Sequence, residues 1–487
     1  MLSVLVAHSY FLEFDQKQRD RAKPYPPLAT LQVAAMLREM GHRVSLFDAM
    51  LASGPSQYSD CLGAVAPQVA LFYEDNYNFL TKMCLGRMRQ AASEMIARAR
   101  LAGARVIVAG SDATDAPEAY LASGAHAVLI GEGLATLRAI VDRLEADPRL
   151  DVADMVAGLA GVAIAGSEDA VPPAGQALLM PEPEHPERPA WDLVSIDDYR
   201  SVWHGAHGHF SLNMAASRGC SFRCNWCAKP IWGSQYLQRR PAEVAAEMTY
   251  LKRTFRPDHV WFADDIFGFR ADWVEAFAQA LDATDGAIPF TIQTRADLLS
   301  ERMVRALVQA RCTEVWIGAE SGSQRVLDAM NKGIRVEEVR EARARLKSAN
   351  IRVGYFLQLG YLDEQLDDIL ATRQLVESTR PDDIGVSVSY PLPGTKFYET
   401  VREQLRGKTR WEESNDLDMM FEGTYRSDFY RQVRDLLHGQ VDAATPADPP
   451  RKPRPRPSRR DLQRRWNRLL ASERDYRLAQ PPLRGAV

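Results

Sequence analysis

The chain alternates short apolar runs with segments of helical period, and this alternation restricts it to α/β folds. In the first 145 residues, helix-compatible segments separate five runs that are typical of strands. These runs cover residues 2–8, 43–50, 68–75, 104–112 and 125–133. Strands that alternate with helices predict a parallel sheet with helices on both faces. Five of them predict a doubly wound, flavodoxin-like domain at residues 1–145.

The alternation resumes after residues 146–205, which are rich in glycine and proline and which we interpret as a linker. Six further strand-like runs follow, at residues 209–217, 258–264, 289–297, 313–321, 351–360 and 382–391. Their spacing predicts a partial (β/α)6 barrel at residues 206–400. In barrels of this kind, functional side chains lie at the carboxyl ends of the strands.

The pattern beyond the barrel predicts a helical extension at residues 401–443. Residues 444–487 include "TPADPPRKPRPRPSRR", a composition that favours a Pro/Arg-rich linker and a solvated basic tail. The basic run has no interleaved aromatic residues, and the net charge of the 487-residue chain is −4. Both observations argue against a nucleic-acid partner.

Composition also restricts the cellular setting. No apolar run is long enough to span a membrane, and the N-terminal residues lack the basic region of a signal peptide. Six cysteines in 487 residues do not make a disulfide framework. We therefore expect a cytoplasmic protein in which clustered thiols are metal ligands.

Half of the cysteines lie in one short motif, "CSFRCNWC", which contains Cys220, Cys224 and Cys227. Structural zinc sites usually supply four ligands as two pairs, whereas the other cysteines of this chain, Cys61, Cys84 and Cys312, are isolated. A four-iron cluster held by three thiolates leaves one iron with an open position. The spacing and the position after the first barrel strand favour such a cluster over a zinc site.

The CxxxCxxC motif after the first strand of a barrel resembles that of the radical S-adenosylmethionine (SAM) enzymes, and the resemblance covers residues 209–400. It implies that Cys220, Cys224 and Cys227 hold a [4Fe–4S] cluster whose fourth iron binds SAM. It also implies that Trp226 lies beside the adenine. In that family, electron transfer from the cluster cleaves SAM to a 5′-deoxyadenosyl radical.

The same resemblance assigns cofactor contacts to polar residues at the later strand ends. Asp264 or Asp265 would meet the SAM amino group, while Glu320 would face SAM and Ser321 would shape the adjoining turn. The remaining candidates are Gln293, Arg295 and Tyr390. For each of them a capping role at a strand end is an equal alternative, and their shared position on one barrel face favours function.

The N-terminal domain resembles the cobalamin-binding domain of one subgroup of radical SAM enzymes. The candidate contacts lie at predicted strand ends and are Tyr73, Glu74, Asn76, Gly110, Ser111, Asp112, Gly131 and Glu132. The DxHxxG motif that supplies an axial histidine is absent from the chain. The resemblance therefore implies base-off cobalamin without an imidazole ligand, and a structural role is favoured for His8.

These observations predict a cobalamin-dependent radical SAM enzyme that methylates carbon or phosphorus of a small molecule and is reduced by flavodoxin or ferredoxin. Residues 417–430 resemble the C-terminal segment of anaerobic magnesium-protoporphyrin ester cyclases, so radical cyclisation or oxidation is the main alternative. A cluster-bearing SAM sensor without turnover is disfavoured by the full set of strand-end residues. A methylthiotransferase would need three further cluster cysteines in the N-terminal domain, where Cys61 and Cys84 are too few.

Overall fold

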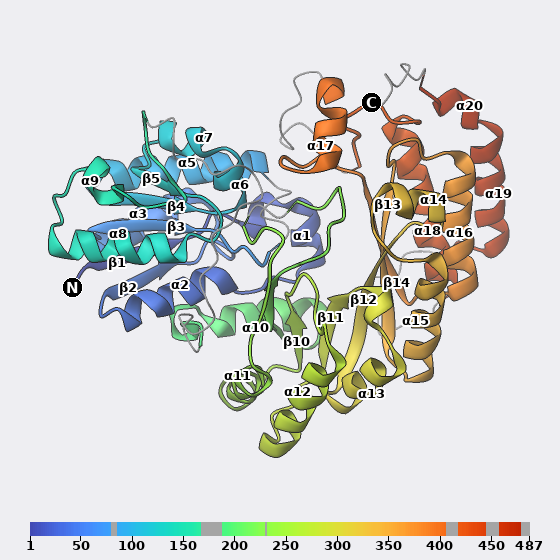
Figure 1. The fold of residues 1–487 in the computed structure, drawn as a ribbon, viewed down its shortest axis with the longest axis horizontal. Coiled ribbons are helices and arrows are strands. Elements are labelled where there is room, and N and C mark those ends of the chain that lie inside the picture. Colours follow the sequence, from blue (N-terminus) through green and yellow to red (C-terminus); the bar gives the residue numbers. More distant parts are fainter. Residues whose placement is uncertain (79–84, 167–187, 229–230, 406–416, 445–456, 479–487) are drawn as a thin grey trace. The chain divides into compact units, whose positions relative to one another are not determined.

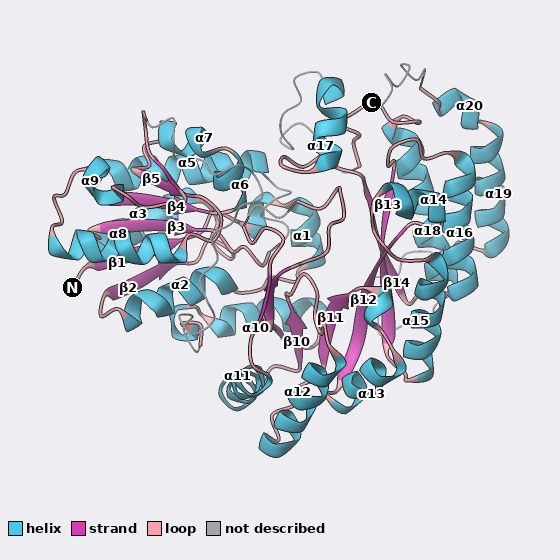
Figure 2. Cartoon of the chain, in the orientation of Figure 1, coloured by secondary structure: helices cyan, strands magenta, loops and turns pink. Residues whose placement is uncertain are grey.

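The computed structural model describes residues 1–78, 85–166, 188–228, 231–405, 417–444 and 457–478 (Figures 1 and 2). The chain divides into two compact units. The first contains residues 1–221 and 229–265, and the second contains residues 222–228, 266–409 and 413–487. None of the described helices combines the length and the apolar character that a bilayer crossing requires.

The first unit is built on a sheet with the strand order β2-β1-β3-β4-β5-β6. Five strands are parallel: β1 (Ser3–Ala7), β2 (Arg43–Phe47), β3 (Val69–Tyr73), β4 (Arg105–Ala109) and β5 (Ala127–Leu129). This is the flavodoxin-like order, so the predicted fold of the N-terminal domain is confirmed. A sixth strand, β6 (Val162–Ala163), adds an antiparallel edge that the sequence did not predict.

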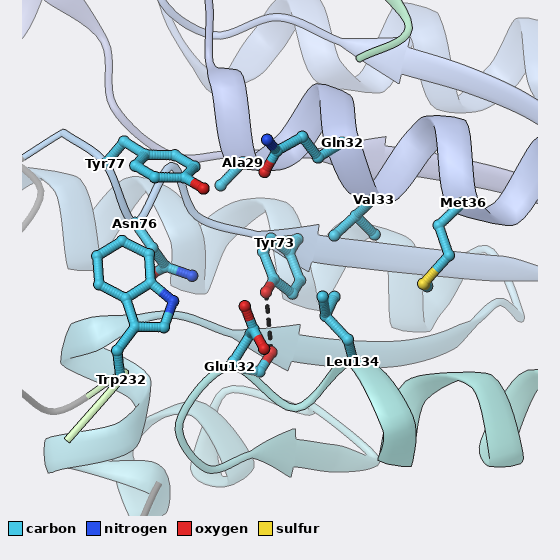
Figure 3. A pocket seen from close by; sticks show the side chains of 10 residues that line it. All are labelled: Ala29, Gln32, Val33, Met36, Tyr73, Asn76, Tyr77, Glu132, Leu134 and Trp232. Carbon is cyan, nitrogen blue, oxygen red and sulfur yellow. Dashed lines mark hydrogen bonds between the residues drawn. The ribbon is translucent and has the colours of Figure 1, made fainter. Parts of the chain in front are cut away.

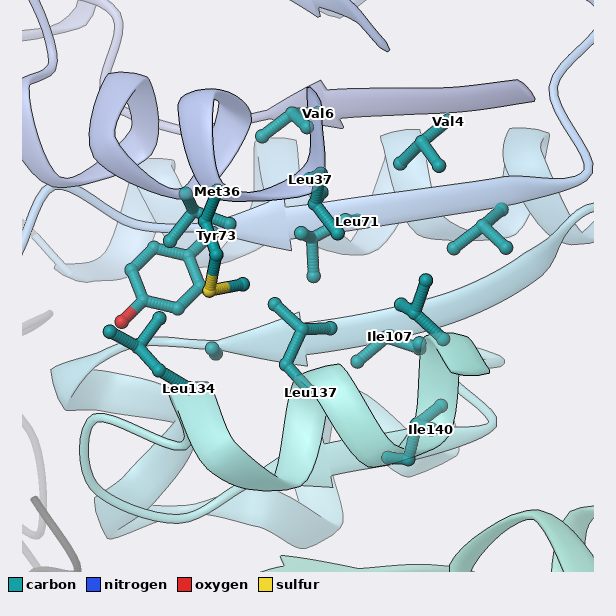
Figure 4. Close-up of a cluster of buried hydrophobic side chains, with 14 of the residues drawn as sticks. Val4, Val6, Met36, Leu37, Leu71, Tyr73, Ile107, Leu134, Leu137 and Ile140 are labelled. Atoms are coloured by element: carbon teal, nitrogen blue, oxygen red, sulfur yellow. The ribbon is translucent and has the colours of Figure 1, made fainter. Parts of the chain in front are cut away.

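Helices cover both faces of this sheet. On one face, α2 (Leu28–Glu39) and α8 (Leu134–Ala146) bury Met36, Leu37, Leu137 and Ile140 against the strands (Figure 4). On the opposite face, α3 (Pro55–Val65) places Tyr58 against Phe72, beside α5 (Leu85–Leu101). Short elements complete the unit: η1 (Leu12–Phe14), α1 (Gln16–Arg21), α6 (Ser111–Asp115), α7 (Pro117–Ala122) and α9 (Val152–Val156).

The segment expected to be a linker contains ordered structure. The part of this segment that is richest in glycine and proline, residues 167–187, lies outside the described residues. After it come η3 (Trp191–Leu193) and α10 (Ile196–His207), which buries Tyr199 and Trp203 in the first unit. The Trp203 indole donates a hydrogen bond to the Pro24 carbonyl at 2.7 Å. Helix α10 was missed because this segment was interpreted from its glycine and proline content, although the apolar residues of α10 follow a helical period.

The second sheet has the strand order β14-β13-β12-β11-β10-β7, as expected for a half barrel, and the six strands match the predicted runs. The first unit contains β7 (Ser211–Met214) and β10 (His259–Phe262), and the second contains β11 (Phe290–Thr294), β12 (Cys312–Glu320), β13 (Arg352–Leu359) and β14 (Asp383–Val388). Strand β7 pairs in parallel with β10, and β11, β12, β13 and β14 pair in parallel with one another in that order.

Helices lie between successive strands of this sheet, as the βα alternation predicts. They are α11 (Pro241–Thr254), α12 (Ala271–Thr284), η4 (Ala296–Leu298), α13 (Glu301–Gln309), α14 (Gln324–Ala329), α15 (Val336–Ser348) and α16 (Leu366–Thr379). A short antiparallel pair, β8 (Ser217–Gly219) with β9 (Tyr236–Gln238), flanks the loop that carries the cysteine motif.

The C-terminal region is helical, with α17 (Lys396–Val401), η5 (Arg402–Leu405), α18 (Ser427–Ala444), α19 (Arg459–Ala471) and α20 (Glu473–Tyr476). The region expected to be a basic tail therefore contains a packed helix. In α19, Leu462, Trp466 and Leu469 are buried, and the helix contacts α18. Its few apolar residues stand among five arginines, which is why composition suggested a solvated segment.

Replacement of Trp466 by alanine tests the packing of α19. Trp466 is 1% exposed, and the Arg373 guanidinium lies 4.6 Å from its ring centroid. Trp466→Ala should lower the free energy of unfolding of the second unit by about 3–5 kcal/mol, measured by urea denaturation with circular dichroism. The control Arg465→Ala, at an exposed position of the same helix, should change it by less than about 0.5 kcal/mol. Equal stability of both variants would contradict the packing of α19.

Candidate functional site

The cysteine motif lies on the loop that follows β8. Cys220, Cys224 and Cys227 are half-buried and form no disulfide bond among the described residues; Cys220 belongs to the first unit, and Cys224 and Cys227 belong to the second. In contrast, Cys312 is buried in β12, and burial raises the pKa of its thiol. A buried thiol of raised pKa is typical of a core cysteine. Cys84 lies outside the described residues.

The two acidic residues after β10 have different surroundings. Asp264 is fully buried, and its carboxylate accepts hydrogen bonds from the Ala216 amide at 3.0 Å and from the Ser217 hydroxyl at 2.5 Å. Asp265 is exposed. Asp264 therefore anchors the main chain that leads to Cys220, and Asp265 is the acid with a solvent-accessible carboxylate.

Burial shifts the titration of Asp264. It raises the pKa of this carboxyl group to about 7, against hydrogen bonds from Ser217 and Ala216 that favour the carboxylate. The group is therefore about half protonated near neutral pH in the folded protein, whereas an unfolded aspartate is ionised there.

Glu320, at the end of β12, forms a buried ion pair that the sequence did not reveal. The Lys332 Nζ lies 2.7 Å from the Glu320 Oε1, and both side chains are less than a tenth exposed. The same ammonium group lies 5.9 Å from the centroid of the Trp226 ring. Burial opposes the charged form of Lys332, but the charge and hydrogen bond of Glu320 together with the charge of Cys224 outweigh it and raise the lysine pKa. Two predicted cofactor residues, Glu320 and Trp226, thus lie near one buried cation.

The backbone around Glu320 is irregular. The register between β12 and β13 shifts between Gly318 and Glu320, and Glu320 has a φ of 56°. Residues other than glycine are rare in this left-handed region, and their backbone is strained there. A Cβ atom at Gly318 would lie 2.7 Å from the Glu320 Oε1 and 2.8 Å from the Lys332 Nζ, so a larger residue there would displace the ends of the ion pair.

The other predicted residues of the second unit have mixed surroundings. Arg295 is buried, donates a hydrogen bond to the Lys332 carbonyl at 2.8 Å and stacks on Phe222 at 3.7 Å. The Ser321 hydroxyl lies 3.1 Å from the Thr372 hydroxyl inside the fold. Both residues therefore have structural contacts. Gln293 and Tyr390 are partly exposed at their strand ends, as a contact with a ligand would require.

In the first unit, several predicted cobalamin contacts are already engaged within the protein. The Tyr73 hydroxyl donates to the Glu132 carbonyl at 2.8 Å (Figure 3). The Glu74 carboxylate accepts from the Ser9 amide at 3.0 Å and packs on Gly110, where a Cβ would lie 2.7 Å from the Glu74 Cγ. Asp112 pairs with Arg89 and accepts from the Tyr120 hydroxyl at 2.7 Å. These side chains stabilise the strand ends. Because their polar atoms already form hydrogen bonds or ion pairs within the protein, few of those atoms remain to bind a ligand.

Two predicted residues retain polar atoms for a ligand. The Asn76 Oδ1 and the Ser111 Oγ are buried and have no hydrogen-bond partner among the described residues. They follow β3 and β4, whose carboxyl ends share one edge of the sheet, and Gly131 and Gly133 adopt left-handed conformations after β5. Asn76 lines a hollow together with residues that include Gln32, Met36, Tyr77, Leu134 and Trp232 (Figure 3). Ser111 lines a second hollow with residues that include Ser9, Glu74 and Asp112.

Glu132 also connects the loop after β5 to the strand before Cys220. Its carboxylate forms an ion pair with Arg218 of β8, with only 3% and 5% of the two side chains exposed. Arg218 was not among the predicted site residues, although it lies only two residues before Cys220. His8 is likewise structural: its Nε2 lies 2.9 Å from the Asp48 Oδ1 and 3.0 Å from the Ala49 amide nitrogen.

The cysteine motif, the strand ends around it and Glu320 all fall within residues 214–376, which match the sequence model of the radical SAM superfamily. The chain carries a radical SAM domain. The expected resemblance is thereby confirmed, and the domain identifies the chain as an enzyme that uses SAM and a [4Fe–4S] cluster.

Several known proteins are similar over most of the chain. An uncharacterized methyltransferase of Pyrococcus horikoshii is 24% identical over 81% of this chain and 82% of its own length. The anaerobic magnesium-protoporphyrin IX monomethyl ester cyclase of Synechocystis sp. is 25% identical over 80% of this chain and 76% of its own. TsrM of Kitasatospora setae, a radical SAM methyltransferase solved with cobalamin and a [4Fe–4S] cluster bound, superposes with a TM-score of 0.66 at 17% identity. That superposition covers 84% of this chain and 79% of TsrM, and it shows a shared fold.

The pKa of Asp264 predicts how the stability of the first unit depends on pH. Between about pH 4 and pH 7 the folded state retains a proton that the unfolded state releases, so stability should fall as the pH rises through this window. The full effect is on the order of 4 kcal/mol. Urea denaturation from pH 5 to pH 8 should show this loss in the wild-type protein and a flatter profile in Asp264→Asn. Asp265→Asn, at the exposed neighbour, should retain the wild-type slope, and an unchanged slope in Asp264→Asn would refute the assignment.

Proposed function

We propose that the chain is a cobalamin-dependent radical SAM enzyme that methylates an unactivated carbon or a phosphorus atom of a small molecule. One observation carries this proposal: a radical SAM domain follows a flavodoxin-like domain in a chain that shares its fold with TsrM. The unpartnered Asn76 Oδ1 and Ser111 Oγ at the carboxyl ends of the first sheet support a corrinoid in that domain.

In this proposal the cysteine loop and its neighbours bind the cluster and SAM. Cys220, Cys224 and Cys227 would be the cluster ligands, and the open iron would bind SAM. A bound cluster supplies the electron that cleaves SAM, with flavodoxin or ferredoxin as the donor class. The exposed Asp265 would accept from the SAM amino group, since Asp264 is occupied by main-chain anchoring.

Glu320, Lys332 and Trp226 would form one wall of the SAM site. The Lys332 ammonium group lies 2.7 Å from the Glu320 carboxylate and compensates for the solvation that both groups lose on burial. The ammonium group also approaches the indole ring, which restricts the orientation of Trp226. The chain therefore offers a charged acceptor for the nucleoside beside an aromatic surface.

The proposed cobalamin is base-off and lacks an imidazole ligand from the protein. The proposal rests on the absence of a DxHxxG motif from the chain. The Nε2 of His8 lies within hydrogen-bond distance of Asp48 and Ala49, and its Nδ1 is buried without a hydrogen-bond partner among the described residues.

A second candidate outcome is radical cyclisation or oxidation of a small molecule. The similarity to the magnesium-protoporphyrin ester cyclase covers 80% of this chain. Residues 417–430 also resemble the C-terminal segment of such cyclases, and several of them, among them Phe421 and Tyr430, are buried in the second unit. The two outcomes share the cluster and SAM and differ in the fate of the substrate radical.

The proposed ligands can be tested one at a time. Anaerobically reconstituted wild-type protein should bind about four irons per chain with the brown absorbance of a [4Fe–4S] cluster. Cys220→Ala, Cys224→Ala and Cys227→Ala should each lose most of this absorbance. Cys312→Ala should retain it, because Cys312 is buried in β12. If Cys312 proved equally necessary for iron binding, the ligand assignment would be wrong.

The products formed from SAM test the reaction. With reductant, the reconstituted protein should release 5′-deoxyadenosine, and reconstitution with hydroxocobalamin should give the absorption spectrum of bound, base-off corrinoid. With substrate, methylation predicts S-adenosylhomocysteine as well. Conversion without S-adenosylhomocysteine would favour cyclisation or oxidation, and protein that binds no corrinoid would refute the cobalamin part of the proposal.

A further inference from the structure

Asn225, between the second and third cysteines of the motif, is bonded through all of its polar groups. Its main-chain amide donates to the Met330 carbonyl at 3.0 Å, and its main-chain carbonyl accepts from the Phe397 amide at 3.0 Å. Its side-chain Nδ2 donates to the Ala329 carbonyl at 2.7 Å. Its Oδ1 accepts from the Tyr361 hydroxyl, also at 2.7 Å. A single residue of the cysteine loop is thus connected to three separate parts of the second unit.

Two of these bonds cap a helix. Ala329 is the last residue of α14, and Met330 is its C-cap. The last carbonyl groups of a helix have no partner within the helix and need donors from elsewhere. Asn225 supplies two such donors, one from the main chain and one from the amide side chain. The turn that contains Cys224 and Cys227 therefore supplies the hydrogen-bond donors that the carbonyl groups at the end of α14 need.

The residues around Asn225 are held by the same turn, residues 329–333. Asn331 donates from its Nδ2 to the Arg223 carbonyl at 2.8 Å. Arg295 stacks on Phe222 and donates to the Lys332 carbonyl, so it connects the two segments from a third side. Each of these contacts involves the main chain or a non-cysteine side chain of the loop, so none of them uses the Cys224 or Cys227 thiol.

We infer that Asn225 is a positioning residue that holds the Cys224–Cys227 turn in its ligand geometry before iron is present. This inference rests on the proposed function, since it assumes that these thiols bind the cluster. A loop held by an independent scaffold loses less conformational freedom when it binds its ligand, so binding is stronger and release is slower. Asn225 itself does not contact iron.

Asn225→Asp is the substitution that tests this role most directly. Aspartate has nearly the shape of asparagine, but its carboxylate cannot donate to the Ala329 carbonyl. It also places a negative charge at a helix C-terminus, where the helix dipole disfavours anions. Tyr361→Phe is a milder second variant, because it removes the hydroxyl bonded to Asn225 while the ring can remain stacked on Phe397, with ring centroids 4.9 Å apart.

The experiment uses the full chain with its reconstituted cluster. Iron release to a ferrous chelator is followed by absorbance, with and without SAM, and the reduced cluster is examined by electron paramagnetic resonance. Asn225→Asp should release iron at least tenfold faster and should change the signal that SAM induces. Tyr361→Phe should release iron about threefold faster. The matched control Asn350→Asp, at an exposed asparagine after α15, should behave as the wild type does.

Thermal unfolding of the iron-free proteins separates positioning from general stability. A positioning role predicts melting temperatures for Asn225→Asp and Tyr361→Phe within a few degrees of wild type, together with faster iron release and an altered signal. Wild-type release rates and spectra in both variants would overturn the inference and leave the proposed function intact. Faster release fully explained by a lower melting temperature would also overturn it. A wild-type protein that binds no iron would overturn the proposed function as well.

Discussion

The ion pair between Arg218 and Glu132 is the interaction on which the arrangement of the first unit depends. It connects the loop after the fifth strand of the flavodoxin-like sheet to the strand before Cys220, with both side chains nearly inaccessible to solvent. Removal of one partner from such a pair leaves an uncompensated buried charge and typically costs about 3–5 kcal/mol. The polypeptide that enters the cysteine motif is therefore fixed to the domain proposed to bind cobalamin, and Asp264 fixes it again at Ala216 and Ser217.

The two ends of the cysteine loop are anchored by different means. Before Cys220 the anchors are buried charges, Arg218 with Glu132 and the carboxyl group of Asp264, all within the first unit. From Phe222 onward the anchors are hydrogen bonds to residues 329–331 and the contact of the Arg295 guanidinium with the Phe222 ring, all within the second unit. The amide groups of Asn225 and Asn331 are neutral and add no charge beside the proposed thiolate ligands. The only cation near Trp226 that the described contacts show, Lys332, is compensated by Glu320.

The sequence predicted what depends on periodicity and on local motifs. Both sheets, their parallel strands and the three clustered cysteines were found because each gives a signal within a few residues. Contacts between distant residues gave no such signal. Lys332 and Asn225 stand among ordinary polar residues, and only the fold brings Lys332 to Glu320 and Asn225 to α14. Helices α10 and α19 were missed because composition outweighed a short helical period in their interpretation.

The left-handed backbone at Glu320 has a consequence for the evolution and engineering of this protein. Glycine would adopt a φ of 56° without strain, and relief of such strain is worth about 1 kcal/mol or more. Substitution of Glu320 by glycine would relieve this strain but would leave the buried Lys332 ammonium without its partner, which typically costs about 3–5 kcal/mol. The ion pair therefore stabilises an unfavourable backbone conformation, and a library that varies position 320 should vary position 332 with it.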